Sequence, residues 1–438
     1  MPRQEDLVSR IIDKAEKILG EYPLCNDCLG RLFAKYGIGL SNYERGLSIK
    51  TFLAFKLHAE YTQGLVSKER LHILARNSGE GVLSLYKKLF NEDLKQDKCF
   101  ICGGGITRYL IRDIAEKACE IIRKHGSRSF VIGISMDKFI VNNELEILVK
   151  HGLETSESIR RELKREVGKE IKSICSIEPD FTSPDIVLII RFDSDFKYEV
   201  FAQPNPVFYE CKLLKTGRGI PFYPLRKIDV GGKHVKSMYE IIGDIFKEAI
   251  GSREIVIHGV GFEGLSTRIL GLGIDVVIEA RSPQRRIDPV MLGEIAKSKT
   301  EGSNVVIEIR SILNRNSVVY MKELSRSARK LYRVSIYVPN GIELGELDLI
   351  ERYFTGSAIT QVVSERSSYP KKTRRKKVYL VKTIQVSRSV FEAIIMCDIG
   401  LSIRGLVKCE SKEVVPCFSS VLNKTLIPLE IDLVNVLR

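Results

Sequence analysis

The segments IVIHGVG (255–261) and DVVIEA (275–280) have the length and the Val/Ile content of buried β-strands, and a glycine-rich loop separates them. Similar segments follow at NVVIEIRSIL (304–313), YRVSIYV (332–338), KVYLVKTIQV (377–386) and FEAIIMCDI (391–399). Helical periodicity is confined to 236–249, 288–298 and 341–353. Many strands with few crossover helices favour a largely antiparallel sheet, so this part of the chain is predicted to be an α+β domain.

The preceding half of the chain has a different pattern. Apolar residues at helical spacing predict helices at 5–20, 48–62, 67–76, 80–90 and 108–125. Strands are then predicted at FVIGISM (130–136), near 145–149 and at DIVLIIRF (185–192), with a helix at 155–174. This pattern indicates a helical module followed by a mixed α/β unit.

Four of the ten cysteines form two CxxC pairs, Cys25 with Cys28 and Cys99 with Cys102. Two such turns can bring four thiolates to one tetrahedral Zn²⁺, so a structural Cys₄ zinc site is predicted. A redox CxxC is the alternative, but it does not account for two copies. The other six cysteines are scattered in apolar contexts and are expected to be reduced core thiols in an intracellular protein.

Charge and hydropathy limit the class of protein. The chain has 438 residues and carries 69 Lys and Arg against 55 Asp and Glu, a net charge of +14. Such a surplus favours a polyanionic partner, although solubility alone would also account for it. The densest basic run, KKTRRKK (371–377), fits either a solvated hairpin or a phosphate-binding segment, and we favour the latter. A charged N-terminus and the lack of a long apolar run predict a soluble, cytoplasmic protein without a membrane partner.

Three clusters of residues, taken together, resemble motifs of one known family. The first is LCNDCLGRLF (24–33) with CFICGG (99–104). The second is PDIVLIIRF (184–192) followed by NPVFYECKLLKTGRGIP (205–221), and the third is HGVGFEGLSTRILGLG (258–273) with EARSPQRRIDP (279–289). In this order they resemble the zinc knuckles, the THUMP-like RNA-binding module and the motif around the catalytic aspartate of the archaeal tRNA pseudouridine synthases, which modify the two adjacent uridines of the TΨC loop.

The resemblance implies a domain organisation and a set of partners. It implies a zinc-knuckle helical module at 1–107, a THUMP-like RNA-binding domain at 108–221 and a pseudouridine-synthase-like domain at 222–438. The implied partner is tRNA, at its T arm. The implied cofactor is structural zinc, and neither an organic cofactor nor a dinucleotide is expected.

The reaction of the family breaks the N1–C1′ bond of uridine, rotates the uracil and rejoins it through C5, for which an aspartate is essential. In this sequence Gly264 and Ser266 stand where the motif has its two aspartates, so the chain resembles a divergent member. Glu263 and Asp275 are the nearby carboxylates that could substitute. RKLYRVSIYV (329–338) places Tyr332 as the residue that stacks on the target base, and the resemblance implies substrate contacts by Arg218, Arg268 and Arg404.

Three hypotheses remain open at this point. The chain is a tRNA pseudouridine synthase, or it is a tRNA-binding homologue without activity because of Gly264 and Ser266, or it is a zinc-stabilised structural module without an RNA role. The net charge and the THUMP-like unit argue against the third hypothesis. Gly264 and Ser266 favour the second hypothesis, because they remove the motif aspartates. Similarity to the family as a whole favours the first hypothesis, an active synthase.

Overall fold

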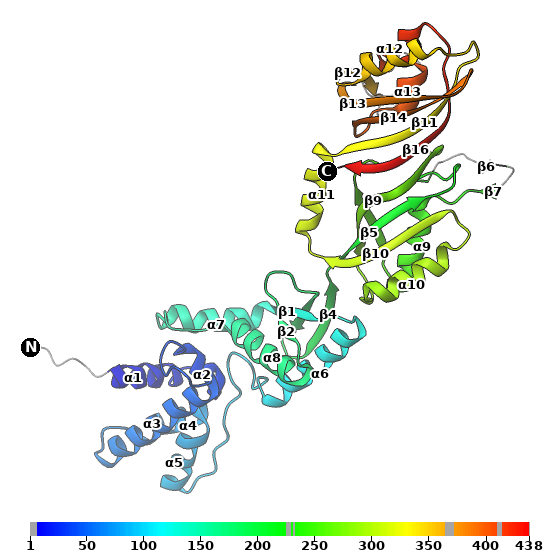
Figure 1. The fold of residues 1–438 in the computed structure, drawn as a ribbon. Coiled ribbons are helices and arrows are strands. Elements are labelled where there is room, and N and C mark those ends of the chain that lie inside the picture. The colour runs from blue at the N-terminus through cyan, green and yellow to red at the C-terminus, as the bar shows by residue number, and fades with distance from the viewer. Residues whose placement is uncertain (1–6, 225–228, 231–232, 364–371, 410–413, 438) are drawn as a thin grey trace, which may run out of the picture. The chain divides into compact units, whose positions relative to one another are not determined.

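The computed structural model describes residues 7–224, 229–230, 233–363, 372–409 and 414–437, and it divides into two compact units, Met1–Pro204 and Asn205–Arg438 (Figure 1). The boundary between units therefore lies at residues 204 and 205, whereas the sequence placed a boundary at 221. The reason is that Val207–Lys215 forms strand β5, which pairs with strands of the second unit.

The first unit begins with helices, as predicted. They are α1 (Leu7–Leu19), α2 (Asn26–Leu32), α3 (Asn42–Thr62), α4 (Lys68–Ser78), α5 (Glu80–Phe90) and α6 (Arg108–Lys124). Serine or threonine side chains cap several of them. Ser41, for example, accepts the backbone N–H of Glu44 in a capping box that starts α3. The short helix α2, which carries the first CxxC pair, was not predicted because it has only seven residues.

The rest of the first unit is a mixed α/β structure. Its four-stranded sheet has the order β2-β1-β3-β4, and its elements are β1 (Ser129–Met136), α7 (Lys138–Lys150), α8 (Ile159–Cys175), β2 (Glu178–Pro179), β3 (Ile186–Phe192) and β4 (Tyr198–Pro204). β1 and β3 are parallel, and α8 crosses over between them. One continuous hydrophobic core includes residues from α1 to β3, so the helical module and the α/β part form a single unit.

One predicted strand is wrong. The segment near 145–149 lies in helix α7, which Asp137 caps by accepting the backbone N–H of Phe139. Ile140 and Ile147 are buried seven residues apart on this helix, a spacing that matches two helical turns. The short apolar run LEILV could not by itself distinguish a strand from a helix.

The second unit is built on a ten-stranded sheet, as the strand pattern predicted (Figure 1). Its order is β10-β5-β9-β16-β11-β14-β13-β12-β15, and β8 pairs with β9. The strands are β5 (Val207–Lys215), β8 (Glu254–Gly259), β9 (Thr267–Arg281), β10 (Val305–Leu313), β11 (Arg329–Tyr337), β12 (Ala358–Val363), β13 (Lys372–Ser387), β14 (Val390–Asp398), β15 (Val414–Val415) and β16 (Ile427–Leu437). All pairings are antiparallel except that of β16 with β9.

Helices and a small ribbon complete the second unit. The helices are α9 (Met238–Ile250), α10 (Pro289–Thr300), α11 (Asn316–Ser327), α12 (Leu344–Phe354), α13 (Ile403–Lys408) and α14 (Phe418–Leu422), and the ribbon consists of β6 (Asp229–Val230) and β7 (Lys233–His234). The three helices predicted from periodicity correspond to α9, α10 and α12. Among the described residues, no helix has the length and apolarity needed to cross a lipid bilayer.

Two glycines bend β9 so that one strand serves two parts of the sheet. Residues 274–281 pair with β5 and β8, whereas 267–269 pair with β16. Gly271 and Gly273 lie between these parts with φ of 56° and 68°, in the left-handed region that favours glycine. A Cβ at Gly271 would lie 2.2 Å from the carbonyl oxygen of Val434, so the close approach of β16 also requires glycine. This bend places the start of β9 beside β16.

The remaining cysteines are not all free. Cys119 and Cys175 form a disulfide, as do Cys409 and Cys417, with Cα–Cα distances of 6.0 and 5.5 Å. These four cysteines are therefore paired where reduced core thiols were expected, and Cys211 and Cys397 are buried and free. Helices α6 and α8 pack together and bring Cys119 to Cys175, a contact that sequence spacing does not reveal.

Candidate functional site

The loop of residues 260–266, between β8 and β9, is the centre of the first candidate site. It lies in the second unit and contains the positions of the family motif. Gly264 and Ser266 are exposed, whereas Glu263 points inward with a side chain only 10% exposed. The loop therefore presents positions 264 and 266 to solvent and keeps its own carboxylate beneath.

Glu263 is held by two residues of β11. Its Oε1 accepts a hydrogen bond of 2.8 Å from the hydroxyl of Tyr332 and is paired with the ammonium of Lys330. Lys330 also donates to the carbonyl oxygen of Gly261 at 2.6 Å. Burial together with the charge of Glu263 raises the pKa of Tyr332, which therefore stays protonated and serves as a donor.

Tyr332 lies beside the loop, as the motif predicted, but the faces of its ring are not exposed. Tyr332 is 3% exposed, so its ring faces are covered by the protein in this conformation. The group that it presents to the loop is the hydroxyl. Its stacking on a base stays a prediction.

Arg218 and Arg268 meet at one buried carboxylate, that of Asp432 on β16. Arg218 donates to Asp432 Oδ1 at 2.7 Å, and Arg268 donates to both carboxylate oxygens at 2.8 and 2.7 Å. Burial opposes the ionisation of Asp432, but the hydrogen bonds and charges of the two arginines outweigh it and lower its pKa. Both arginine side chains remain partly exposed, at 27% and 28%, beside the loop.

Two of the predicted arginines also bind the loop itself. Arg218 donates to the carbonyl oxygen of Ser266 at 2.7 Å. Arg404, on α13, donates to Ser266 Oγ at 3.3 Å. Three predicted residues that are far apart in the sequence thus contact one short loop: Arg218, Tyr332 and Arg404. The fourth, Arg268, meets Arg218 at Asp432. Asp432, Lys330 and Lys215 complete this arrangement, and none of these three was predicted from the sequence.

Lys215, the last residue of β5, lies beneath the loop and is 0% exposed. Its ammonium donates to the carbonyl oxygens of Gly264 at 2.7 Å, Ile220 at 2.9 Å and Leu265 at 3.4 Å. Burial lowers its pKa to about 8, although the charge of Glu263 acts in the opposite direction. A buried cation therefore supports the backbone at the position where the family motif has its aspartate.

The two substitute carboxylates differ in position. Asp275 lies on β9 and pairs with Lys212 at 3.3 Å and with Arg310 at 3.8 Å, within the part of the sheet that pairs with β5. Glu263, in contrast, belongs to the loop and bonds to Tyr332. Of the two carboxylates, Glu263 therefore belongs to the loop, and Asp275 belongs to the strand that follows it.

Phe262, in the first half of the loop, belongs to an aromatic cluster. Its ring stacks on Phe222 with a centroid distance of 3.8 Å, and Tyr223 meets it edge to face at 5.6 Å. Phe262 thus anchors the beginning of the loop through packing rather than through charge.

The basic run of 371–377 forms the beginning of β13, apart from Lys371, which lies outside the described residues. Residues 372–377 pair with β12, and most of their side chains are exposed. Lys376 donates to the carbonyl oxygen of Ile399 at 2.6 Å, in the segment that leads to α13 and Arg404. The described part of the basic run, 372–377, is thus a solvent-exposed strand paired with β12. Phosphate binding by this run stays a prediction.

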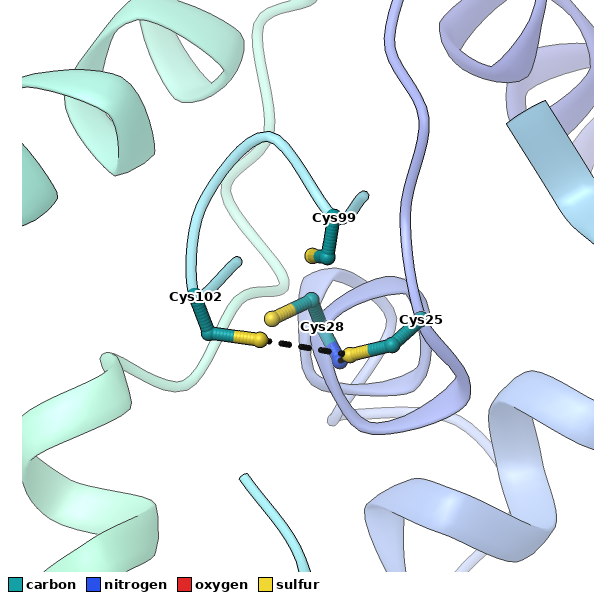
Figure 2. Close-up of side chains that lie close together, drawn as sticks. All are labelled: Cys25, Cys28, Cys99 and Cys102. Carbon is teal, nitrogen blue, oxygen red and sulfur yellow. Dashed lines mark hydrogen bonds between the residues drawn. The ribbon is translucent and has the colours of Figure 1, made fainter. Parts of the chain in front are cut away.

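The second candidate site is the cluster of Cys25, Cys28, Cys99 and Cys102 in the first unit (Figure 2). The four sulfur atoms lie within 4.8 Å of one another, and those of Cys25 and Cys102 are 3.6 Å apart. Sulfur atoms bound to one tetrahedral ion at about 2.3 Å would be about 3.8 Å apart. The pairing predicted from the two CxxC turns is confirmed, and the cluster could hold one metal ion.

A buried arginine connects this cluster to the α/β part of the same unit. Arg31 is 0% exposed and donates to Cys28 Sγ at 3.1 Å and to Glu144 of α7 at 3.1 Å. It also pairs with Glu162 of α8 at 3.5 Å. With a metal ion bound, such contacts would partly neutralise the charge of the four thiolates and hold the ligands in place.

Comparisons with known proteins extend over both units. Two family models match, "Pus10 THUMP domain, archaeal" over residues 114–191 and "Pus10, C-terminal" over residues 208–437. The tRNA pseudouridine synthase Pus10 of Thermosphaera aggregans is 35% identical, over 98% of this chain and 97% of the relative. That of Methanocaldococcus jannaschii is 31% identical, over 96% and 93%. Among solved structures, that of a Cbf5-Nop10-Gar1 complex is similar with a TM-score of 0.30 and 11% identity, over 51% of this chain and 47% of that chain.

Proposed function

Because the chain belongs to the tRNA pseudouridine synthase Pus10 family, we propose that it binds tRNA and that its site isomerises uridine to pseudouridine. The observation that carries this proposal is the contact of Arg218, Arg404 and Tyr332 with the loop 260–266. Arg218 also shares the carboxylate of Asp432 with Arg268. Partly exposed guanidinium groups bind phosphates, and a protected carboxylate–tyrosine pair lies beneath them. We assign the T arm as the substrate region, on the resemblance to the family, and the cytoplasm as the location.

In this proposal Glu263 supplies the catalytic carboxylate, and Lys330 and Tyr332 are the groups that hold it. Lys330 pairs with Glu263, and the Tyr332 hydroxyl donates to the same carboxylate oxygen and orients it. The arginines hold the RNA backbone while the target base leaves its stack and enters beside the loop. A carboxylate that is 10% exposed can act on the ribose only after the loop has shifted, so we expect slow turnover.

A second candidate function is tRNA binding without isomerisation, and position 264 favours it. A glycine there offers neither a nucleophile nor a base. A Cβ at Gly264 would meet nothing within 4 Å, so the site has room for a side chain that this sequence lacks.

Pseudouridine mapping separates the two functions. An unmodified tRNA transcript is incubated with the wild-type protein and with Glu263→Gln, and pseudouridine is located by mass spectrometry. We expect slow formation in the T loop by the wild-type protein and none by the variant, because an amide cannot act as a base. Formation at an equal rate by both proteins would exclude Glu263. No formation by a wild-type protein that binds tRNA would favour the second function.

The salt dependence of binding tests the arginines and the basic strand. We expect Arg404→Ala and Arg375→Ala each to lower the slope of log K against log salt by about 0.7–0.9, the value for one lost phosphate contact. Arg352 on α12 has a side chain 78% exposed and lies outside the loop contacts, so Arg352→Ala should leave the slope unchanged. Filter binding at several salt concentrations measures the slopes. Equal slopes for all four proteins would contradict this placement of the RNA.

We also propose that the metal of the cysteine cluster is zinc with a structural role. Four thiolates at tetrahedral spacing suit Zn²⁺, and a site in which all four positions are protein ligands leaves no position for a substrate. When bound, the ion would crosslink α2 to the turn at 99–102. Metal analysis of the purified protein tests its identity, because iron also binds four thiolates.

A further inference from the structure

Lys215 is a buried cation whose environment differs from that of the other buried lysine at the loop. Lys330 forms an ion pair with Glu263, whereas the ammonium of Lys215 donates all three of its hydrogen bonds to backbone carbonyl oxygens. Two of these oxygens belong to the loop, at Gly264 and Leu265, and the third belongs to Ile220, which follows Arg218 by two residues. One ammonium thus joins the loop to the segment that carries an RNA-facing arginine.

We infer that Lys215 is a positioning residue for RNA binding: its ammonium fixes the backbone of the loop at Gly264 and Leu265 and supplies a positive charge beneath it. This inference rests on the proposed function, because it takes the loop as the RNA-binding surface. The carbonyl groups of Gly264 and Leu265 turn toward Lys215, and Gly264 itself is exposed to solvent. The buried charge adds to the attraction of a phosphate, because little water screens it.

Protonation of Lys215 is required for this arrangement. The ammonium has three hydrogens for three carbonyl oxygens, whereas a neutral amine has two hydrogens and directs a lone pair at the third oxygen. The charged groups that face Lys215 are Glu263 in the loop and Arg218 in the neighbouring segment. Lys330 and Tyr332 pair with Glu263, and Asp432 and Glu430 pair with Arg218.

The sign of the pH effect distinguishes positioning from global stability. The pKa of Lys215 is lowered from 10.5 to about 8 in the folded protein, so Lys215 loses its charge in the folded state between pH 7 and 9. The unfolded state binds more protons in this range, and the Lys215 contribution to folding stability therefore rises with pH. Binding of tRNA should fall over the same range, because the loop loses its support and its charge.

Filter binding of tRNA at pH 7 and pH 9, at constant salt, tests the inference. For the wild-type protein we expect the Kd to rise about 5- to 10-fold, which corresponds to a shift of about one pKa unit when RNA binds. Lys215→Arg keeps its charge and should bind with the same Kd at both pH values. Lys215→Met should bind weakly at both. Lys212 lies on the same strand, so Lys212→Met is the matched control and should retain the wild-type pH effect.

The possible outcomes separate this inference from the proposed function. A wild-type Kd that is equal at pH 7 and pH 9, or that rises as much in Lys215→Arg as in the wild type, would overturn the role of Lys215. Absence of tRNA binding by the wild-type protein at pH 7 would overturn the proposed function instead. Thermal unfolding of the variants checks that each is folded, so that weak binding by Lys215→Met is compared only for folded protein.

Discussion

Gly264→Asp is expected to raise the rate of pseudouridine formation by about 10²–10⁴-fold, the usual contribution of a positioned acid–base group. A Cβ at this position meets no atom within 4 Å, and the φ of Gly264 lies outside the left-handed region that requires glycine. An aspartate therefore fits without strain on the exposed side of the loop. Single-turnover formation of pseudouridine in a tRNA transcript measures the effect.

The surroundings of position 264 are suited to an ionised carboxylate. The ammonium of Lys215 binds the carbonyl oxygen of Gly264 itself, and Arg218 and Arg404 bind Ser266 two residues later. These positive charges should lower the pKa of the new aspartate and keep it charged at neutral pH. The substitution would thus complete a site in which the supporting cations are already present.

Gly264→Asn is the matched control, because it has the shape of aspartate without its charge or its basicity. We expect the Asn variant to isomerise uridine no faster than the wild-type protein. A Gly264→Asp protein that binds tRNA normally but is no faster than Gly264→Asn would show that the register of the motif or the identity of the missing group is wrong.

Removal of the metal is expected to lower the melting temperature of the first unit while that of the second unit stays unchanged. The four cysteines belong to the hydrophobic core that extends from α1 to β3, and Arg31 connects Cys28 to α7 and α8. The free energy of zinc binding is about 10–16 kcal/mol in zinc-finger peptides, and such a free energy becomes folding free energy. A loss of about 5 kcal/mol would lower the Tm of a unit of this size by about 10–20 °C.

Calorimetry of the full chain with and without a strong chelator measures this effect. We expect one of two thermal transitions to move and the other to stay. Cys28→Ser should reproduce the shift, whereas Cys211→Ala, which removes a buried thiol of the second unit, should leave the metal-dependent transition unchanged. If Cys28→Ser retained stoichiometric metal and an unshifted transition, the four-cysteine site would be refuted.

Much of the architecture could be predicted from local patterns. Alternation and Val/Ile content indicated β9, β10, β11, β13 and β14, and helical periodicity indicated α3 to α6 and α8 to α10. Patterns of this kind depend on neighbours within a few residues. The strand predicted near 145–149 was wrong for the same reason, because its short apolar run fits the periodicity of a strand and that of a helix equally well. Strand β16 was not predicted either.

The candidate sites also include residues that local patterns reveal and residues that they do not. Each CxxC turn is recognisable within four residues, and Cys25, Cys28, Cys99 and Cys102 lie together as predicted. Asp432 and Lys215 have no local signature. Each is a charged residue within an apolar strand. Lys215 contacts Gly264, 49 residues away, and Asp432 contacts Arg218, 214 residues away.

Residue types at short spacing were enough to predict a four-cysteine cluster, a mostly antiparallel α+β domain and the loop motif of a tRNA pseudouridine synthase without its aspartate. The three-dimensional fold was needed to show that Arg218, Arg404, Tyr332 and the buried Lys215 contact that loop. It was also needed to show that Glu263 rather than Asp275 belongs to the loop. Their meeting depends on the bend of β9 at Gly271 and Gly273 and on its pairing with both β5 and β16. Such long-range pairing is set by the burial of whole strands, which no short stretch of sequence encodes.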